Sequence, residues 1–321
     1  MTSKKINKVF VNAPERCGSN YLCRFLQEKF GLFYVPPVHF LKYIKTLISA
    51  EKKQHSKIHE LFCNRLDDFN LKKESRLYES FLRQNQSIIS LKNFYFDELF
   101  QSSVGHIPVF KENELCTYFP LISENLRSAV IVSQLRDPRM MHRSAKEIRR
   151  GFLKSKFGSV NQTIRTWQEA EQNICFLEAS GQSLKHFYIS YENLVSQPEK
   201  IIKQLDSLPR DTFAYDHDDH VMRMKKISET SAARRNLNSD DFNARLLKNQ
   251  KWYDFTDQHI SCQLTQQMNR RGYKSGNVGK IPSNILASFF LLREPIEKLR
   301  NKWINVTVKD GSKALYDPGD F

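Results

Sequence analysis

Three short runs rich in β-branched and aromatic residues each lead into a polar turn and then into a segment with helical spacing. The runs are Val9–Asn12, Ala129–Leu135 and His186–Ile189. Such alternation is typical of a parallel sheet with helices on both faces. Ligands of these sheets bind at the carboxyl ends of the strands. We therefore expect an α/β three-layer sandwich with a central parallel sheet, and one site where the three runs end.

The first run is followed by a loop suited to phosphate. Residues 16–21 read Arg-Cys-Gly-Ser-Asn-Tyr, and helical spacing extends from Asn20 to Phe30. Small residues let backbone N–H groups approach an anion, and a helix amino terminus favours negative charge. Arg16 adds a cation and Ser19 a hydroxyl donor. The Lys-Ser/Thr pair of a Walker A loop is absent, which disfavours a kinase or NTPase.

The second run ends in Arg136-Asp137-Pro138-Arg139, and Ser144 follows eight residues after the first arginine. Asp137 and Pro138 favour a turn, and the aspartate can cap the helix expected from about Met140. If the turn curls back, Arg136 and Ser144 can bind the same anion. A surface arginine in an ordinary strand–turn–helix link is the alternative.

Composition narrows the partners. The 321 residues include 50 lysines and arginines against 35 acids, a net charge of +15. This indicates an anionic partner: a nucleotide, nucleic acid, a polyanionic glycan or an acidic membrane surface. Six cysteines without a CxxC pair or zinc-type spacing indicate reduced thiols and no metal site. No signal-like or membrane-spanning apolar stretch is found, so we expect a cytoplasmic protein.

The remaining segments suggest how the chain is divided. Dense charges and helical periods indicate a helical insert at about 36–103, with a short strand at Ser87–Leu91 and another at Ile107–Phe110. We expect a single domain over 1–275 and a helical extension over 276–321. The apolar run within that extension either packs on the domain or makes peripheral contact with a membrane surface.

In their order and spacing, these motifs resemble the PAPS-dependent sulfotransferase family. The resemblance implies a P-loop-NTPase-like fold and transfer of a sulfonate group from PAPS (3′-phosphoadenylyl sulfate), a co-substrate, to an acceptor hydroxyl or amine. It covers about 8–30, 105–205 and 245–273, and rests on Pro14–Leu22, Leu135–Arg139 with Ser144, Tyr191–Leu194 with Pro198-Glu199, and a weaker match from Lys251 to Tyr273.

The resemblance also implies roles for individual residues. Arg16 would stabilise charge on the leaving oxygen, Tyr191 would contact the adenine, and Arg136 with Ser144 would bind the 3′-phosphate. Arg245 or Lys251 would close over that phosphate. The 5′-phosphosulfate would be held by Arg16, Cys17, Gly18, Ser19, Asn20 and Tyr21.

The sequence departs from the family pattern in the loop and leaves the base open. Glu15 places an acid beside the phosphosulfate, and Cys17 and Asn20 replace commoner hydroxyl residues. Deprotonating the acceptor requires a general base. The candidates are His106, Glu112 and Glu114. We favour Glu112, because Val109–Glu112 reads as a strand entering the site; a surface carboxylate paired with Lys111 is the alternative.

Several functional alternatives stay open. The positive charge favours a saccharide or glycolipid acceptor, while a phenol, a steroid or a peptide tyrosine is also compatible. A non-catalytic nucleotide-binding member of the family is a second possibility. A nucleic-acid-binding protein is a third, with a basic helix carrying Arg143, Lys146, Arg149 and Arg150. No recognisable nucleic-acid-binding motif accompanies that helix, so we expect no nucleic acid partner. The sequence does not set the oligomeric state.

Overall fold

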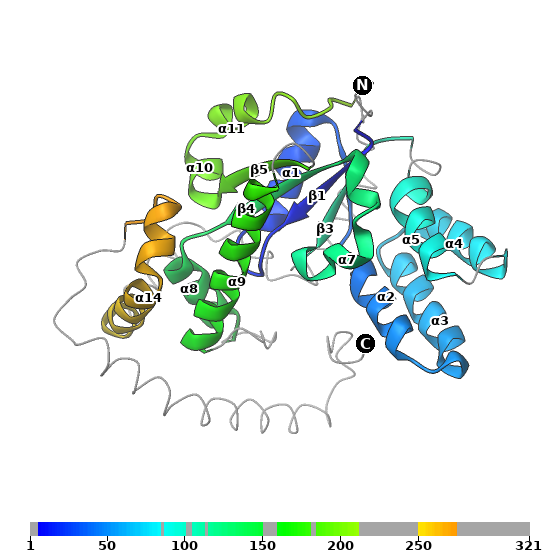
Figure 1. The fold of residues 1–321 in the computed structure, drawn as a ribbon, viewed down its shortest axis with the longest axis horizontal. Helices are drawn as coiled ribbons and strands as arrows, with labels where there is room; N and C mark the ends of the chain where they lie inside the picture. Colours follow the sequence, from blue (N-terminus) through cyan, green and yellow to red (C-terminus); the bar gives the residue numbers. More distant parts are fainter. Residues whose placement is uncertain are drawn as a thin grey trace. The chain divides into compact units, whose positions relative to one another are not determined.

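The computed structural model describes residues 6–84, 87–100, 105–112, 115–149, 159–180, 184–211 and 250–274 (Figure 1). These residues form two compact units. The first contains the described residues up to Leu135 and those from Asn173 to 211, and the second contains those of Arg136–Gln172 and 250–274.

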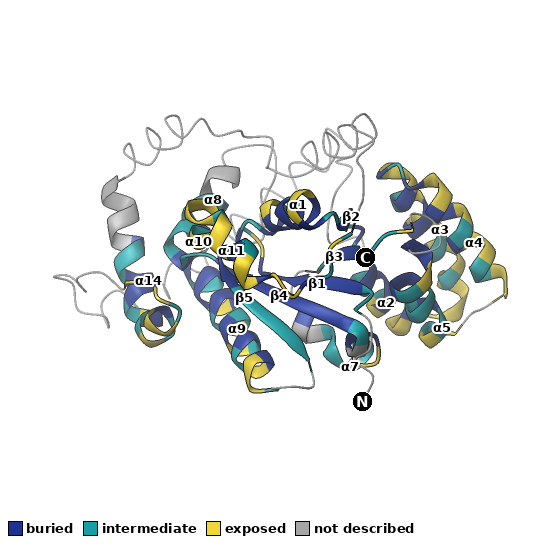
Figure 2. Ribbon diagram, turned by 90° about the horizontal axis from the view of Figure 1, so that it is seen from above, coloured by how far each residue is buried: buried dark blue, intermediate teal, exposed yellow. Residues whose placement is uncertain are grey.

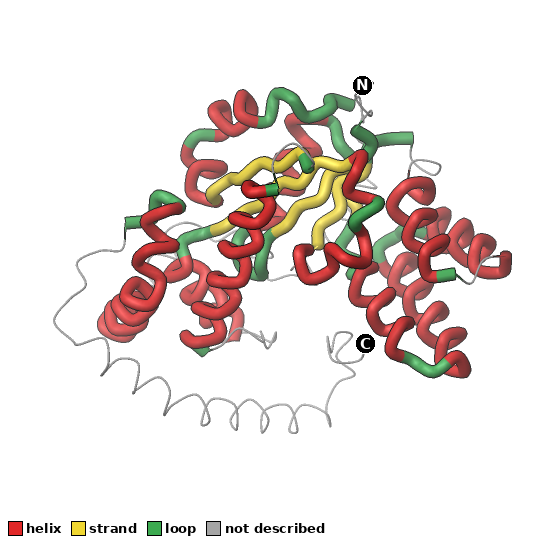
Figure 3. Tube along the Cα trace, viewed as in Figure 1, coloured by secondary structure: helices red, strands yellow, loops and turns green. Residues whose placement is uncertain are grey.

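The first unit is built on a five-stranded sheet in the order β2-β3-β1-β4-β5 (Figures 1 and 3). All four strand pairs are parallel, so the carboxyl ends of the strands lie together along one side of the sheet, which we call the carboxyl edge, and their amino ends lie along the other, the amino edge. The expected parallel sheet is confirmed. The strands are β1 (Lys8–Asn12), β2 (Phe33–Val35), β3 (Pro108–Glu112), β4 (Ala129–Leu135) and β5 (Lys185–Ser190).

Most helices of the first unit precede β4. They are α1 (Ser19–Phe30), α2 (Phe40–Ser49), α3 (Lys52–Asp68), α4 (Lys72–Gln84), α5 (Ile88–Asn93), the π-helix η1 (Phe94–Leu99), η2 (Leu115–Tyr118), α7 (Phe119–Ile122), η3 (Asn125–Ser128), α10 (Tyr191–Ser196) and α11 (Pro198–Gln204). Helix α9 (Val160–Ala179) begins in the second unit and ends in the first. The second unit also contains α8 (Pro138–Arg149) and α14 (Gln250–Arg270).

Helices cover both faces of the sheet. Lys111 of β3 hydrogen-bonds to Asn20 of α1, so its face is the one that α1 covers. The preceding residue, Phe110, faces the other way because side chains alternate along a strand. Its ring lies 5.0 Å from that of Phe96 in η1, between ring centroids. Figure 2 shows α1 along the buried strands. The expected α/β sandwich is therefore confirmed.

Aromatic rings join the helices after β2 to this sheet. Phe40 at the start of α2 stacks on Tyr95 of η1, with centroids 3.7 Å apart and planes 4° from parallel. The ring of Phe96 then contacts Phe10 of β1 at 5.2 Å. Aromatic pairs of this kind contribute about 0.5–1.5 kcal/mol each beyond the area they bury. The packing accounts for helices in the region where the sequence indicates an insert.

One predicted strand is wrong. Residues 87–91 were expected to form a strand, yet Ile88–Asn93 is helix α5. Leu91 is only 1% exposed whereas Ile89 is 60% exposed. A helix satisfies this short apolar run because it buries one side of the run and leaves the rest in solvent. Strand β2, by contrast, was not expected from the sequence.

No helix among the described residues is long and apolar enough to cross a membrane. The predicted extension over 276–321 lies outside the described residues. The boundary at 275 and the single-domain assignment therefore stay predictions.

Candidate functional site

The loop between β1 and α1 is shaped by two residues with left-handed backbone. Arg16 has φ 70° and Gly18 has φ 84°. The Cys17 N–H donates to the Pro14 carbonyl at 3.4 Å, and the Tyr21 N–H donates to the Gly18 carbonyl at 2.9 Å. A left-handed arginine is uncommon and persists only where its surroundings fix it, often at a functional site.

The loop ends at the amino terminus of α1. The first helical residue is Ser19, and helix geometry leaves the first N–H groups of any helix without a partner inside it. Those groups and the helix dipole together favour an anion. The twelve residues of α1 continue this helix well beyond its first turn.

Gly18 is required by its backbone and also by a close approach. A Cβ atom at this position would lie 2.4 Å from ring carbons of Tyr191. That ring also meets Tyr21 edge-on, with centroids 6.3 Å apart. The structure therefore brings together three residues predicted for the donor site, although Tyr191 is distant from the loop in sequence.

Tyr191 is held in place by the end of β5. It is the first residue of α10, and the preceding Ser190 caps that helix. The Asn193 N–H donates to Ser190 Oγ at 3.2 Å. The cap fixes where the helix starts, and so where the Tyr191 side chain leaves the backbone.

Two loop residues that depart from the family pattern, Glu15 and Cys17, differ in their exposure to solvent. Glu15 is exposed and Arg16 is partly exposed. Cys17 is fully buried, with 0% exposure of the whole residue. The replacement of a hydroxyl residue therefore falls on a position whose side chain lies inside the protein.

Lys111 lies at the candidate site, and sequence reasoning did not include it. Its Nζ donates to the side-chain oxygen of Asn20 at 2.7 Å, and Tyr34 Oη donates to the same oxygen at 3.2 Å. The contact brings a cation to the first turn of α1. The register of β1 and β3, in which Val11 lies opposite Lys111, sets this position. The only signal in the sequence was a lysine inside a predicted strand.

The candidate bases fall at different edges of the sheet. His106 precedes β3, at the amino edge, where its Nδ1 lies 3.2 Å from Asp211 Oδ1. This is the edge opposite to the loop, and we leave His106 out of the proposed site. Glu112 ends β3 at the level of Asn12, the last residue of β1. The Glu112 side chain and the whole of Glu114 lie outside the described residues.

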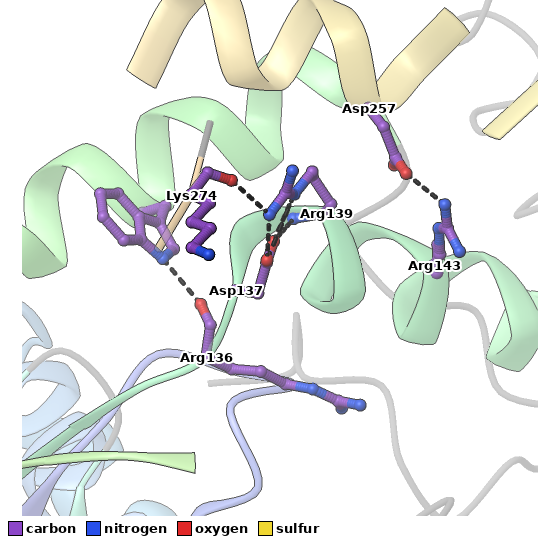
Figure 4. Close-up of polar contacts among 7 residues, drawn as sticks. Arg136, Asp137, Arg139, Arg143, Asp257 and Lys274 are labelled. Carbon is purple, nitrogen blue, oxygen red and sulfur yellow. Dashed lines mark hydrogen bonds and ion pairs between the residues drawn. The ribbon is translucent and has the colours of Figure 1, made fainter. Parts of the chain in front are cut away.

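The second unit contains the predicted 3′-phosphate residues. Asp137 caps α8 by accepting from the Arg139 N–H at 2.9 Å, as the sequence indicated. The Arg136 carbonyl accepts from Trp167 Nε1 at 2.9 Å, which fixes the backbone at this turn. Arg139 is occupied: it pairs with Asp137 and donates to the Lys274 carbonyl at 3.0 Å. The Arg136 side chain extends away from this cluster (Figure 4).

Helix α8 is tied to α14 by an ion pair between Arg143 and Asp257 (Figure 4). Burial raises the pKa of Asp257, while Arg143 opposes that rise. Ser144 is partly exposed on α8. Lys251 lies in the first turn of α14, but its side chain is outside the described residues, as is all of Arg245. Within the described chain, no group of three or more His, Cys, Asp or Glu residues could hold a metal.

The comparison with family models agrees with the sequence resemblance. The model of the sulfotransferase family matches residues 8–208. Two solved structures are similar to the chain at low identity. The sulfotransferase domain from the curacin biosynthetic pathway is 20% identical, with a TM-score of 0.43 over 64% of this chain and 74% of that one.

The second solved structure is the sulfotransferase domain from the Synechococcus PCC 7002 olefin synthase. It is 18% identical, with a TM-score of 0.42 over 66% of this chain and 77% of that one. No curated protein matches the chain.

Proposed function

Since the chain belongs to the sulfotransferase family, we propose that it transfers a sulfonate group from PAPS to an acceptor hydroxyl or amine. The observation that carries the proposal is the loop from Arg16 to Ser19. Its left-handed residues lead into the amino terminus of α1, and Tyr191 packs on its glycine. Such a loop is suited to the phosphosulfate end of a nucleotide.

The proposed reaction is an in-line displacement at sulfur. The acceptor oxygen forms a bond to sulfur as the bond from sulfur to the 5′-phosphate oxygen breaks, and the acceptor loses its proton to a base. Arg16 stabilises the charge that develops on the leaving oxygen. Because a guanidinium keeps its proton, it acts electrostatically and not as an acid.

Lys111 extends this positive charge toward the sulfonate. Asn20 orients the ammonium through the 2.7 Å hydrogen bond, which fixes it at the first turn of α1. A cation already oriented before the reaction needs little rearrangement as charge develops, and so stabilises the transition state efficiently. We assign Lys111 to the sulfonate oxygens.

Residues of the second unit are proposed for the 3′-phosphate. Arg139 and Arg143 already have carboxylate partners in Asp137 and Asp257. Arg136 extends away from the Asp137–Arg139 pair (Figure 4), and Ser144 lies on the following helix. We assign Arg136 and Ser144 to the 3′-phosphate, the group that distinguishes PAPS from ATP-like nucleotides. Arg245 and Lys251 keep the proposed role of closing over it.

The acceptor is proposed from charge. A net charge of +15 favours an anionic or glycan acceptor, and a saccharide or glycolipid hydroxyl is our first choice. Glu112 is the base candidate from the sequence, since its strand ends at the loop edge. We also propose a cytoplasmic location, which rests on the sequence alone.

Nucleotide binding tests the donor site. We expect PAP, the nucleotide that remains when PAPS loses its sulfonate group, to raise the melting temperature of the protein far more than ADP, because ADP lacks the 3′-phosphate. Arg136→Ala should weaken PAP binding by about 1.5–3 kcal/mol, the range for a charged hydrogen bond. The control is Arg210→Ala, which removes an equal charge from an exposed pair with Asp206. Stabilisation by a short oligonucleotide without any effect of PAP would refute the proposal.

Transfer is tested separately. PAPS labelled in the sulfonate is incubated with saccharide, glycolipid, phenol, steroid and tyrosine-peptide acceptors, and the labelled products are counted. Labelling of the saccharide or glycolipid supports the first choice, and labelling of another class corrects the acceptor alone. PAP binding without transfer to any acceptor, or to water, would instead identify a non-catalytic member of the family.

A further inference from the structure

A histidine follows the strand that the sequence did not reveal. β2 is parallel to β3, with Val35 opposite Phe110, so the residues after Val35 leave the sheet at its carboxyl edge. His39 lies four residues beyond Val35 and immediately precedes α2. It therefore belongs to the edge that also carries the Arg16–Ser19 loop.

The position of His39 is fixed from both sides. Its backbone is left-handed, with φ 54°, and its carbonyl accepts from the Tyr43 N–H at 3.1 Å. On the preceding side, Arg65 Nη2 donates to the Pro37 carbonyl at 3.0 Å. A non-glycine residue in this backbone region is retained only where its neighbours determine it. The imidazole is thus attached to a well-defined point of the edge.

The imidazole of His39 is uncharged at neutral pH. Burial, assisted by the positive charges of Arg65, Lys111 and Lys42, lowers the pKa of His39 to about 3. The ring is therefore neutral at neutral pH and carries a lone pair. It is partly exposed, and no group in the described part of the chain hydrogen-bonds to it.

His39 and the loop share one cation. Lys111 both influences the charge of His39 and donates to Asn20 on α1. A sulfonate bound at Lys111 would bring negative charge beside the cations that disfavour the imidazolium. Its arrival would offset the part of the pKa lowering that comes from these cations, whereas the larger part, which comes from burial, would stay.

We propose, as a deepening of the proposed function on which it rests, that His39 is the general base for the acceptor. The acceptor proton passes to a ring nitrogen of His39 while the acceptor oxygen bonds to sulfur. The electron pair of the broken sulfur–oxygen bond leaves on the 5′-phosphate of PAP. The ring later returns its proton to water. This assigns to His39 the role for which the sequence favoured Glu112.

The first test replaces His39 with asparagine, which tolerates the left-handed backbone and takes up no proton. Release of labelled sulfonate from PAPS is measured with water as the acceptor and with each class in the acceptor panel. We expect a loss of about 10²–10⁴-fold in rate, with the Kd for PAP changed less than twofold. His55→Asn is the matched control, a partly exposed histidine of α3 that bonds to the Ala50 carbonyl.

The second test separates chemistry from structure. His39→Gly also suits a positive φ, and it leaves room for a free base. Added imidazole should restore the transfer rate of this variant in proportion to its neutral form, which a structural defect would not allow. Near-normal transfer by His39→Asn, with no rescue of His39→Gly by imidazole, would overturn the proposal. A loss of transfer in Glu112→Gln of the size expected for His39→Asn, with no loss in His39→Asn itself, would also overturn it.

The same experiments distinguish failure of the base from failure of the function. If wild-type protein binds PAP and transfers sulfonate but His39→Asn does so equally well, only the assignment of the base is wrong. If wild-type protein does not bind PAP, or binds it and transfers nothing even to water, the proposed function fails and this inference fails with it.

Discussion

Lys8 and Lys111 lie at opposite edges of the same sheet, and their partners differ in kind. Lys8 begins β1 at the amino edge, is fully buried and forms an ion pair with Asp97 of η1. Lys111 lies near the carboxyl edge and donates to the neutral amide of Asn20. A carboxylate cancels the charge of a lysine, whereas an amide orients the ammonium and leaves its charge in place.

A second pair at the amino edge follows the same pattern. His106 faces Asp211 at 3.2 Å, and the same carboxylate accepts from the Ile107 N–H at 2.9 Å. Lys8 and His106 at this edge each have a carboxylate partner, which suits a structural role. At the other edge, burial lowers the pKa of His39 and the charges of Arg65 and Lys111 lower it further, and such cations suit the binding of an anion. This difference between the edges supports the proposed site at the carboxyl edge.

The largest effect is expected when Lys8, at the amino edge, loses its carboxylate partner. Asp97→Asn should destabilise the fold by about 3–5 kcal/mol, because it leaves the Lys8 ammonium buried without its counter-charge. Urea unfolding measures the free energy. The control is Glu98→Gln, which removes the same charge from the exposed neighbour of Asp97 in η1. PAP affinity should be unchanged in both; a weakened PAP Kd in Asp97→Asn would contradict the separation of the two edges.

The opposite result is expected at the functional edge. Lys111→Met should lower the transfer rate by about 10²–10³-fold, because an oriented charge is lost from the transition state. Its unfolding free energy should change by less than about 1 kcal/mol, since Asn20, the acceptor left behind, still accepts from Tyr34. Lys185→Met is the control, a strand lysine whose ammonium donates to the Ser207 carbonyl at 2.7 Å. Equal transfer rates in the two variants would remove Lys111 from the site.

Sequence reasoning succeeded where the signal is local. Ala129–Leu135 is buried along its length, and its β-branched run Val130–Val132 predicted β4 with the same bounds. β2 was missed because its three residues are too short to show a period, and only pairing with β3 defines them as a strand. Ile88 and Ile89 favoured a strand that packing of Leu91 turned into a helix.

The same distinction between local signals and long-range contacts holds for the site residues. The Arg16–Tyr21 loop could be predicted, since its residues are contiguous and its glycine has a local role. The Lys111–Asn20 hydrogen bond joins positions 91 apart, and only strand register sets it. His106 was a candidate because the resemblance implies a histidine or glutamate base before the Arg136 motif, and the direction of β3 puts it at the amino edge, opposite the loop. The contacts that depend on strand pairing are therefore the part of the site that could not be predicted from the sequence.

The two edges can also be compared through their glycines. Gly18 and Gly105 both have positive φ, 84° and 72°, but a Cβ on Gly105 would meet nothing within 4 Å. Gly105→Ala should therefore cost only the backbone strain, about 1–2 kcal/mol. Gly18→Ala should cost roughly 1 kcal/mol more, because its Cβ displaces the Tyr191 ring. Urea unfolding measures both, and equal costs would show that the Tyr191 contact does not constrain the loop.

The smallest effect is expected from the cap that positions Tyr191. Ser190→Ala removes the acceptor for the Asn193 N–H and should cost about 1 kcal/mol of stability. The control is Ser196→Ala at the other end of α10, where the hydroxyl donates to the Glu192 carbonyl at 2.7 Å and caps nothing. Both serines belong to one short helix, but only Ser190 sets where Tyr191 leaves the backbone. Ser190→Ala should thus weaken PAP binding several-fold and Ser196→Ala should not. If the two variants bind PAP alike, Tyr191 contributes to the loop by packing alone and not to the nucleotide.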